Sequence, residues 1–205
     1  MAEHGRHIRS SFDAELNALT NDVLKMSALA QRLLENAIQG LFRRDTDLCN
    51  ETIADDEQVD LLEKQVDREG INLLIRYQPV ASDMRRIVSA MKISGNLERV
   101  ADQSVAIARR VKKLNLGPSV SEVLLLEPLY REALAILRDS VQAFVEGDAE
   151  LARQLKPRDR QLDRLNADFN DQAAERIMTN PPNAPTYMNL ILIARALEHI
   201  GAVPT

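Results

Sequence analysis

The chain has 205 residues, and 26 Lys and Arg stand against 31 Asp and Glu, which gives a formal net charge of −5 at pH 7. This acidic balance argues against a general nucleic-acid-binding protein, because such proteins need a basic face to release counterions from phosphate. Aromatic residues make up only 3% of the chain, and because sheets favour aromatic and β-branched residues, the composition predicts an all-helical fold.

The first predicted helix covers residues 11–43 and carries a heptad pattern. Phe12, Leu19, Met26 and Leu33 recur every seven residues, and further apolar residues are interleaved on the same period. Such a stripe is typical of a helical bundle or a coiled coil. At about 1.5 Å per residue this helix is ~50 Å long, so we expect partner helices of similar length.

Two more long helices are predicted before the middle of the chain. The second helix covers residues 45–77 and ends at Gln78-Pro79, because the residue before a proline is disfavoured in the α region. The third helix covers residues 80–112. A segment that contains Asn, Gly, Pro and two Ser follows it, and this composition predicts a linker.

The sequence after this linker repeats the sequence before it. A shift of 103 residues aligns 37–62 with 140–165, and a shift of 100 residues aligns 91–100 with 191–200. Seven positions of the first alignment are identical: Gln39/Gln142, Asp45/Asp148, Leu48/Leu151, Asp56/Asp159, Gln58/Gln161, Asp60/Asp163 and Leu62/Leu165. The repeat predicts two tandem three-helix bundles that are related by internal pseudo-symmetry.

The domain boundaries follow from this repeat. We expect the first three-helix bundle over residues 1–112, a linker over 113–122 and the second bundle over 123–205.

Three local features are also predicted. Asp45 and Asp148 are expected to be the N-caps of the second and fifth helices. Pro157 is expected to kink or restart the fifth helix. Cys49 aligns with Ala152, which favours a small packing residue over a reactive thiol.

Paired acidic residues are the pattern that could carry chemistry. Asp56 with Asp60 and Glu98 with Asp102 stand four residues apart, so each pair shares one helix face. Like charges at ~5–6 Å cost about 3 kcal/mol at an effective dielectric of ~20, so a cluster of them favours protons or a cation. Oxygen ligands suit hard ions such as magnesium, calcium, manganese or iron. A solvated acidic face is the simpler alternative for any one pair, but the second copy keeps the Asp-x-x-x-Asp pair.

Other catalytic patterns are missing from the sequence. The three histidines do not form a cluster, and no Glu is followed three positions later by His, so the Glu-x-x-His ligands of di-iron oxidase bundles are absent. There is no Gly-rich phosphate loop and no Cys-x-x-Cys motif. No apolar run approaches the ~20 residues of a membrane span. The sequence therefore predicts a soluble, cytoplasmic protein that is not an enzyme.

Two runs of sequence around the second and third predicted helices form a long motif. They are Tyr77-Gln-Pro-Val-Ala-Ser-Asp-Met-Arg-Arg-Ile87 and Met91-Lys-Ile-Ser-Gly-Asn-Leu-Glu-Arg-Val-Ala-Asp102. This motif resembles the signature of the PhoU family, the regulators of bacterial phosphate uptake. The start Phe12-x-x-Glu15-Leu16-x-x-Leu19 and the duplicated helix pattern agree with this resemblance, which covers nearly the whole chain. The resemblance implies two three-helix bundles with metal sites, often iron clusters, that paired Glu/Asp-x-x-x-Asp motifs hold on the bundle surface.

Carried over by position, the resemblance implies seven metal ligands in two sites. The first site would consist of Asp56, Asp60, Glu98 and Asp102, and the second of Asp159, Asp163 and Glu198. The metal implied is iron, with magnesium, manganese, calcium and zinc as alternatives, and the sites need not be filled. The sequence departs from the family pattern at Ala202, where an aspartate is expected, and Pro204 follows. The sixth helix is therefore expected to be truncated: either its last turns were replaced or removed, or the second site was lost.

The resemblance implies a non-enzymatic negative regulator of phosphate uptake and phosphate-starvation signalling. It implies contacts with the ATPase subunit of the phosphate ABC transporter and with a sensor histidine kinase, and a homodimer; neither nucleic acid nor a membrane span is expected. Two alternatives remain open. One is a metal-dependent carboxylate-bundle enzyme, which the missing His ligands disfavour, and the other is a metal-free helical adaptor.

Overall fold

The computed structural model describes residues 2–202, which form six long helices and two short 3-10 helices. In chain order these are α1 (Ala2–Arg43), α2 (Thr46–Tyr77), α3 (Ala81–Leu114), η1 (Ser121–Leu126), α4 (Glu127–Glu146), α5 (Ala149–Thr179), η2 (Pro181–Asn183) and α6 (Ala184–Gly201). The described residues contain no strand, so the prediction of an all-α fold is confirmed. Within this same range, no helix is both long and apolar enough to cross a membrane.

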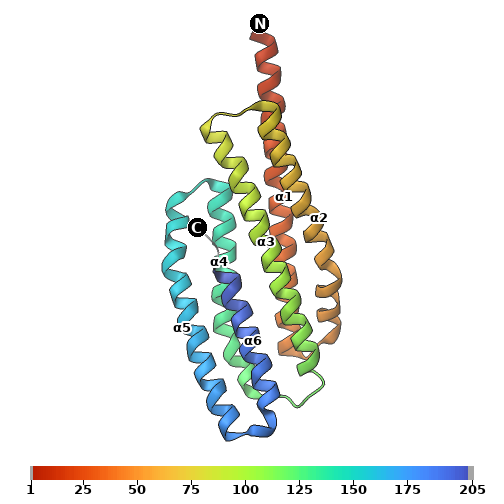
Figure 1. The fold of residues 1–205 in the computed structure, drawn as a ribbon, viewed down its shortest axis with the longest axis vertical. Coiled ribbons are helices and arrows are strands. Elements are labelled where there is room, and N and C mark those ends of the chain that lie inside the picture. Colours follow the sequence, from red (N-terminus) through yellow and green to blue (C-terminus); the bar gives the residue numbers. More distant parts are fainter. Residues whose placement is uncertain (1, 203–205) are drawn as a thin grey trace.

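The six helices form two bundles, α1–α3 and α4–α6, as the repeat predicts. The bundles lie side by side, because α3 packs against α6 and α1 contacts α4 (Figure 1). Their buried apolar residues join in one continuous core. The first bundle is the longer one, since α3 has 34 residues and α6 has 18. The turn between α2 and α3 therefore projects beyond the second bundle (Figure 1).

The heptad residues of α1 face this core. Phe12, Leu19, Met26 and Leu33 are all buried, and burying one such side chain stabilises the fold by about 1.5–3 kcal/mol. The helix begins at Ala2 rather than near residue 11, so the predicted start was wrong. Pro204, which was expected to block α6, lies outside the described residues.

The second and fifth helices begin in the same way. Asp45 and Asp148 are N-caps, and each carboxylate accepts hydrogen bonds from the backbone N–H groups two and three residues further on, at 2.9–3.3 Å. The residue before each cap has a positive φ, 57° at Arg44 and 67° at Gly147. The prediction of both N-caps is confirmed, and the repeat extends to the geometry of a single turn.

Removing either cap is expected to destabilise the protein. Asp45→Ala and Asp148→Ala each leave two helix N–H groups without their acceptor, so each should lower the free energy of unfolding by about 1 kcal/mol. Urea unfolding followed by circular dichroism measures this loss. Asp13→Ala, at an exposed position within α1, is the control, and a loss no larger than that of the control would contradict the assignment.

Pro157 lies inside α5, which continues from Ala149 to Thr179 without interruption. The expectation that the helix restarts there was wrong. A proline within a helix removes one hydrogen bond, and the next residue, Arg158, links α5 to α4. Arg158 donates from Nε to Glu132 at 2.8 Å and also forms an ion pair with Asp139.

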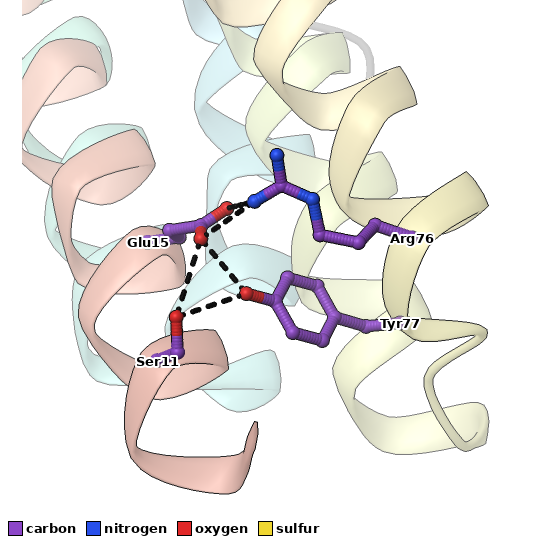
Figure 2. A network of polar contacts seen from close by, with 4 residues as sticks. All are labelled: Ser11, Glu15, Arg76 and Tyr77. Atoms are coloured by element: carbon purple, nitrogen blue, oxygen red, sulfur yellow. Dashed lines mark hydrogen bonds and ion pairs between the residues drawn. The ribbon is translucent and has the colours of Figure 1, made fainter. Parts of the chain in front are cut away.

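A polar network lies at the C-terminal end of α2. Figure 2 shows that Tyr77 and Arg76 both point at the Glu15 carboxylate of α1, beside Ser11. The Tyr77 hydroxyl donates to Glu15 Oε1 at 2.8 Å, and Arg76 Nη1 donates to both Glu15 oxygens at 2.9 and 3.1 Å. Gln78 then takes a left-handed conformation, with φ 45°. The network thus fixes the position from which the α2–α3 turn projects.

Candidate metal centre

The antiparallel pair α2 and α3 brings the four carboxylates predicted for the first copy together. Asp56 and Asp60 lie on α2, and Glu98 and Asp102 lie on α3. Burial raises the pKa of Asp56, and the negative charges of Asp60 and Asp102 raise it further. The two predicted acidic pairs therefore share one electrostatic environment.

Glu98 experiences the same environment from the opposite helix. Burial raises its pKa, and the charges of Asp102, Asp60, Glu63 and Asp56 add to this effect. Glu63 was not predicted, although its spacing of three residues from Asp60 places it on the same face of α2. We define the first carboxylate cluster as Asp56, Asp60, Glu63, Glu98 and Asp102.

The first carboxylate cluster lacks compensating partners. The Oδ1 atom of Asp56 is buried and has no hydrogen-bond partner in the described part of the chain. Among the residues that the structure describes, no member of the cluster forms an ion pair. The positive charge of Arg109 lowers the pKa of Asp56, but less than burial and the two aspartates raise it. A buried, unpaired carboxylate oxygen among like charges favours protonation or a bound cation.

The second copy brings its three predicted carboxylates together as well, but beside positive charge. Burial raises the pKa of Glu198, whereas His199 lowers it; Asp163 and Asp159 raise it, and Arg195 again lowers it. The Nε2 atom of His199 lies 3.6 Å from the Glu198 carboxylate. We call Asp159, Asp163 and Glu198 the second carboxylate cluster.

The two clusters differ at three aligned positions. With the shifts of 103 residues for α2 and 100 residues for α3, the second copy has two carboxylates fewer and gains Arg195, while His199 stands in place of Arg99. The replaced pairs are Glu63/Asn166, Gly95/Arg195 and Asp102/Ala202. The first cluster is therefore the more acidic of the two.

The donor chemistry of the first cluster fits a hard cation, because its five side chains offer only carboxylate oxygens. The buried Oδ1 atom of Asp56, which has no partner, is a free ligand atom. As the side chains stand, however, no three His, Cys, Asp or Glu groups of residues 10–202 are arranged closely enough to hold an ion. The second cluster fits a cation less well, since Arg195 and His199 lie beside Glu198.

Two other features lie outside this centre. Burial raises the pKa of the Cys49 thiol to about 11, Asp45 adds to the shift and Lys112 opposes it, so the thiol is not a nucleophile at neutral pH. A cavity of about 240 Å³ lies at the far end of the first bundle, where Arg44 donates hydrogen bonds to carbonyl groups of the linker. None of the predicted carboxylates lines this cavity.

Comparison with known proteins finds matches over both copies. The family model described as "PhoU domain" matches residues 23–111 and 126–202. A phosphate-specific transport system accessory protein PhoU homolog from Pseudomonas putida is 31% identical over 196 residues, which are 95% of this chain and 77% of that protein. A homolog of the same description from Rhizobium meliloti is 30% identical over 197 residues, 95% of this chain and 83% of that protein.

A solved structure agrees with the sequence matches. The crystal structure of PhoU from Pseudomonas aeruginosa is similar to this fold with a TM-score of 0.89 and 29% identity. The similarity covers 93% of this chain and 91% of that chain.

Proposed function

Because the chain belongs to the PhoU family, we propose that it is a negative regulator of phosphate uptake and of the phosphate-starvation response. Family membership makes it a regulatory, non-enzymatic protein of phosphate transport. The finer proposal is that it acts in the cytoplasm, as a homodimer. Its proposed contacts are the ATPase subunit of the phosphate ABC transporter and a sensor histidine kinase. The relatives are accessory proteins of phosphate-specific transport, which supports this proposal.

The proposal includes a metal centre in the first copy, with Asp56, Asp60, Glu98 and Asp102 as ligands. Iron is the proposed metal, and magnesium, manganese, calcium and zinc are alternatives. The observation that carries this proposal is the buried Oδ1 atom of Asp56, which has no partner and lies among like charges. A bound cation would neutralise these charges and link α2 to α3. The second carboxylate cluster is proposed as a weaker site, because it has fewer donors and because Arg195 and His199 lie beside Glu198.

Replacing Glu98→Gln and Asp102→Asn together is expected to abolish metal binding by the first cluster. The change removes both carboxylates of α3, so α2 alone cannot surround an ion. Elemental analysis of the purified full chain and calorimetric titration with ferrous and magnesium ions measure the loss. The matched control is Asp168→Asn with Asp171→Asn, an exposed acidic pair on α5. Unchanged metal content in the Glu98/Asp102 variant would contradict the proposed ligands.

The regulatory part of the proposal is tested separately. In a strain that lacks the chromosomal gene, a phosphate-starvation reporter should be active in phosphate-rich medium, and expression of the full chain should switch it off. A reporter that stays active would contradict the proposed regulator. Full repression by the Glu98/Asp102 variant would instead support the metal-free helical adaptor, because repression would then not need the metal centre.

A further inference from the structure

The α2–α3 turn carries a group of large apolar side chains that face solvent. Ile71 and Ile75 on α2 are 48% and 70% exposed, and Val80, Met84 and Val88 on α3 are 71%, 46% and 38% exposed. Soluble proteins seldom leave several neighbouring apolar side chains exposed unless they bind a partner. The second bundle does not cover them, because the turn projects beyond it (Figure 1).

These apolar residues continue the helix faces that carry the first carboxylate cluster. On both helices, the residues of this face follow at intervals of three or four, which places them in one row. The row on α3 is Val80, Met84, Val88, Met91, Gly95, Glu98 and Asp102, and the row on α2 is Ile75, Ile71, Asp67, Glu63, Asp60 and Asp56. We call these two rows the α2–α3 face. Its end at the turn is apolar, and its other end is acidic.

The middle of the α2–α3 face is open. A Cβ atom added to Gly95 would meet nothing within 4 Å. Closer to the α2–α3 turn, the two helices pack tightly, since a Cβ atom added to Gly70 would lie 2.8 Å from the Cγ and Sδ atoms of Met91. The polar network of Glu15, Arg76 and Tyr77 holds the apolar end in place (Figure 2). The apolar end of the face is therefore tied to α1, and its middle is open to a partner.

We propose that the α2–α3 face is the docking site for an amphipathic helix of a partner protein. The apolar side chains of that helix pack on Ile71, Ile75, Val80 and Met84, and its Lys or Arg side chains lie over the first carboxylate cluster. A further helix can pack against two antiparallel helices, and the added helix turns the first bundle into a four-helix bundle. The distance along α2 from Asp60 to Ile75 is about 22 Å, so the docked helix has about 15 residues.

Charge complementarity selects this occupant over two others. A second copy of the chain that used the same face would place carboxylates against carboxylates or against apolar side chains. An anionic lipid surface would be repelled by the first carboxylate cluster, none of whose described members is paired with a cation. A basic amphipathic helix has apolar side chains that match the apolar end of the face and positive charges that match its acidic end.

The second copy lacks this arrangement. Its α5 and α6 keep exposed apolar residues at the positions that align with Ile75 and Val88. These are Met178, which is 76% exposed, and Met188, which is 58% exposed. However, its row on α6 has Arg195 in place of Gly95 and Ala202 in place of Asp102. Because the arginine would repel a basic helix, we infer one docking site per chain, in the first copy.

The test uses the full chain in a chelating buffer and a synthetic helical peptide of 18 residues. The docking face of the peptide carries leucines along one half of its length and lysines along the other half. Calorimetric titration is expected to give one site, and methyl NMR is expected to show shifts at Ile71, Ile75 and Met84. Ile75→Ser with Met84→Ser, and separately Asp60→Asn with Glu98→Gln, should each weaken binding by about tenfold or more. The apolar substitutions are at exposed positions, and circular dichroism verifies that each variant folds.

The matched controls are Leu116→Ser, which is 91% exposed outside the face, and Met178→Ser in the second copy; both should leave the affinity unchanged. Equal weakening by a control, or shifts of equal size at Met178 and Met188, would overturn the proposal. The proposal would also be overturned if sedimentation showed a dimer, or if the chain bound phosphatidylglycerol vesicles, and if Ile75→Ser with Met84→Ser abolished that association. The proposal rests on the proposed function only because a regulator acts by binding. A cation bound by the first carboxylate cluster would compete with the Lys or Arg side chains of the docked helix, so the titration is kept free of metal, and a failed metal centre leaves its result intact.

Discussion

Gly40→Ala is expected to destabilise the protein by about 1–3 kcal/mol, and adding Cys49→Ala is expected to restore most of that loss. A Cβ atom at Gly40 would lie 2.6 Å from the Cys49 Sγ and 2.9 Å from the carbonyl oxygen of Asp45. Both distances are shorter than van der Waals contact, and Cys49 is fully buried. The thiol therefore cannot move away without disturbing the packing around it.

The second copy supplies the control for this prediction. Residues 103 positions further on are Ala143 and Ala152, so the repeat has already exchanged both members of the pair. The turn is otherwise the same, because the backbone N–H of Asp148 donates to the carbonyl of Ala143 at 2.9 Å, as Asp45 does to Gly40 at 2.9 Å. The backbone of this turn thus accepts an alanine when the residue opposite is small.

The measurement is a double-mutant cycle by urea unfolding of the parent chain, both single variants and the double variant. Cys49→Ala alone should be mildly destabilising, because it leaves a small cavity. The double variant should lose on the order of 1–2 kcal/mol less stability than the sum of the two single losses. Additive losses would show that the thiol is not the cause, and a stable Gly40→Ala variant would show that the turn adjusts freely.

The helices and their assembly could be predicted because their signals are local or repeated. The heptad stripe of Phe12, Leu19 and Met26 shows one buried face without any knowledge of the partners. Asp45 and Asp148 could be assigned as N-caps because each precedes a helix in an aligned copy. In both cases the chain needs only its own neighbouring residues to form the structure.

Features that depend on distant parts of the chain could not be predicted. Arg158, next to Pro157, forms ion pairs with Glu132 and Asp139 of α4, and nothing in the local sequence identifies these partners. The exposure of Ile75 and Val80 depends on the different lengths of the two bundles, and an apolar period alone is typical of a core-facing row. The start of α1 at Ala2 was missed because its first residues lack the apolar period.

The candidate metal centre could be predicted only in part, for the same reason. Spacing places Asp56 with Asp60, and Glu98 with Asp102, on single helix faces. The antiparallel packing of α2 and α3 then adds Glu63 to the group. In the second copy, the effect of Arg195 and His199 on Glu198 follows from α6 alone, since both stand within three residues of Glu198 in the sequence.

Ala202→Asp is expected to strengthen metal binding by the second copy, because it restores the carboxylate that aligns with Asp102. A further ligand adds donor oxygens and negative charge, so the affinity should rise by about tenfold. Adding Arg195→Gly, which restores the residue of the first copy, should raise it by about another tenfold, since the arginine no longer opposes the ion. The carbonyl of residue 202 accepts a hydrogen bond from Arg99 Nη2 at 2.7 Å, which holds this position against the first bundle.

Calorimetric titration of the full chain should then show a second site that approaches the affinity of the first. The matched control is Ala149→Asp, which adds a carboxylate at the exposed start of α5, far from the second cluster along that helix. An equal gain from the control would mean that net charge alone attracts the ion. Two equal sites in the unmodified chain would contradict the prediction that the second cluster binds metal more weakly. The two clusters would then bind alike despite the differences Asp102/Ala202 and Gly95/Arg195.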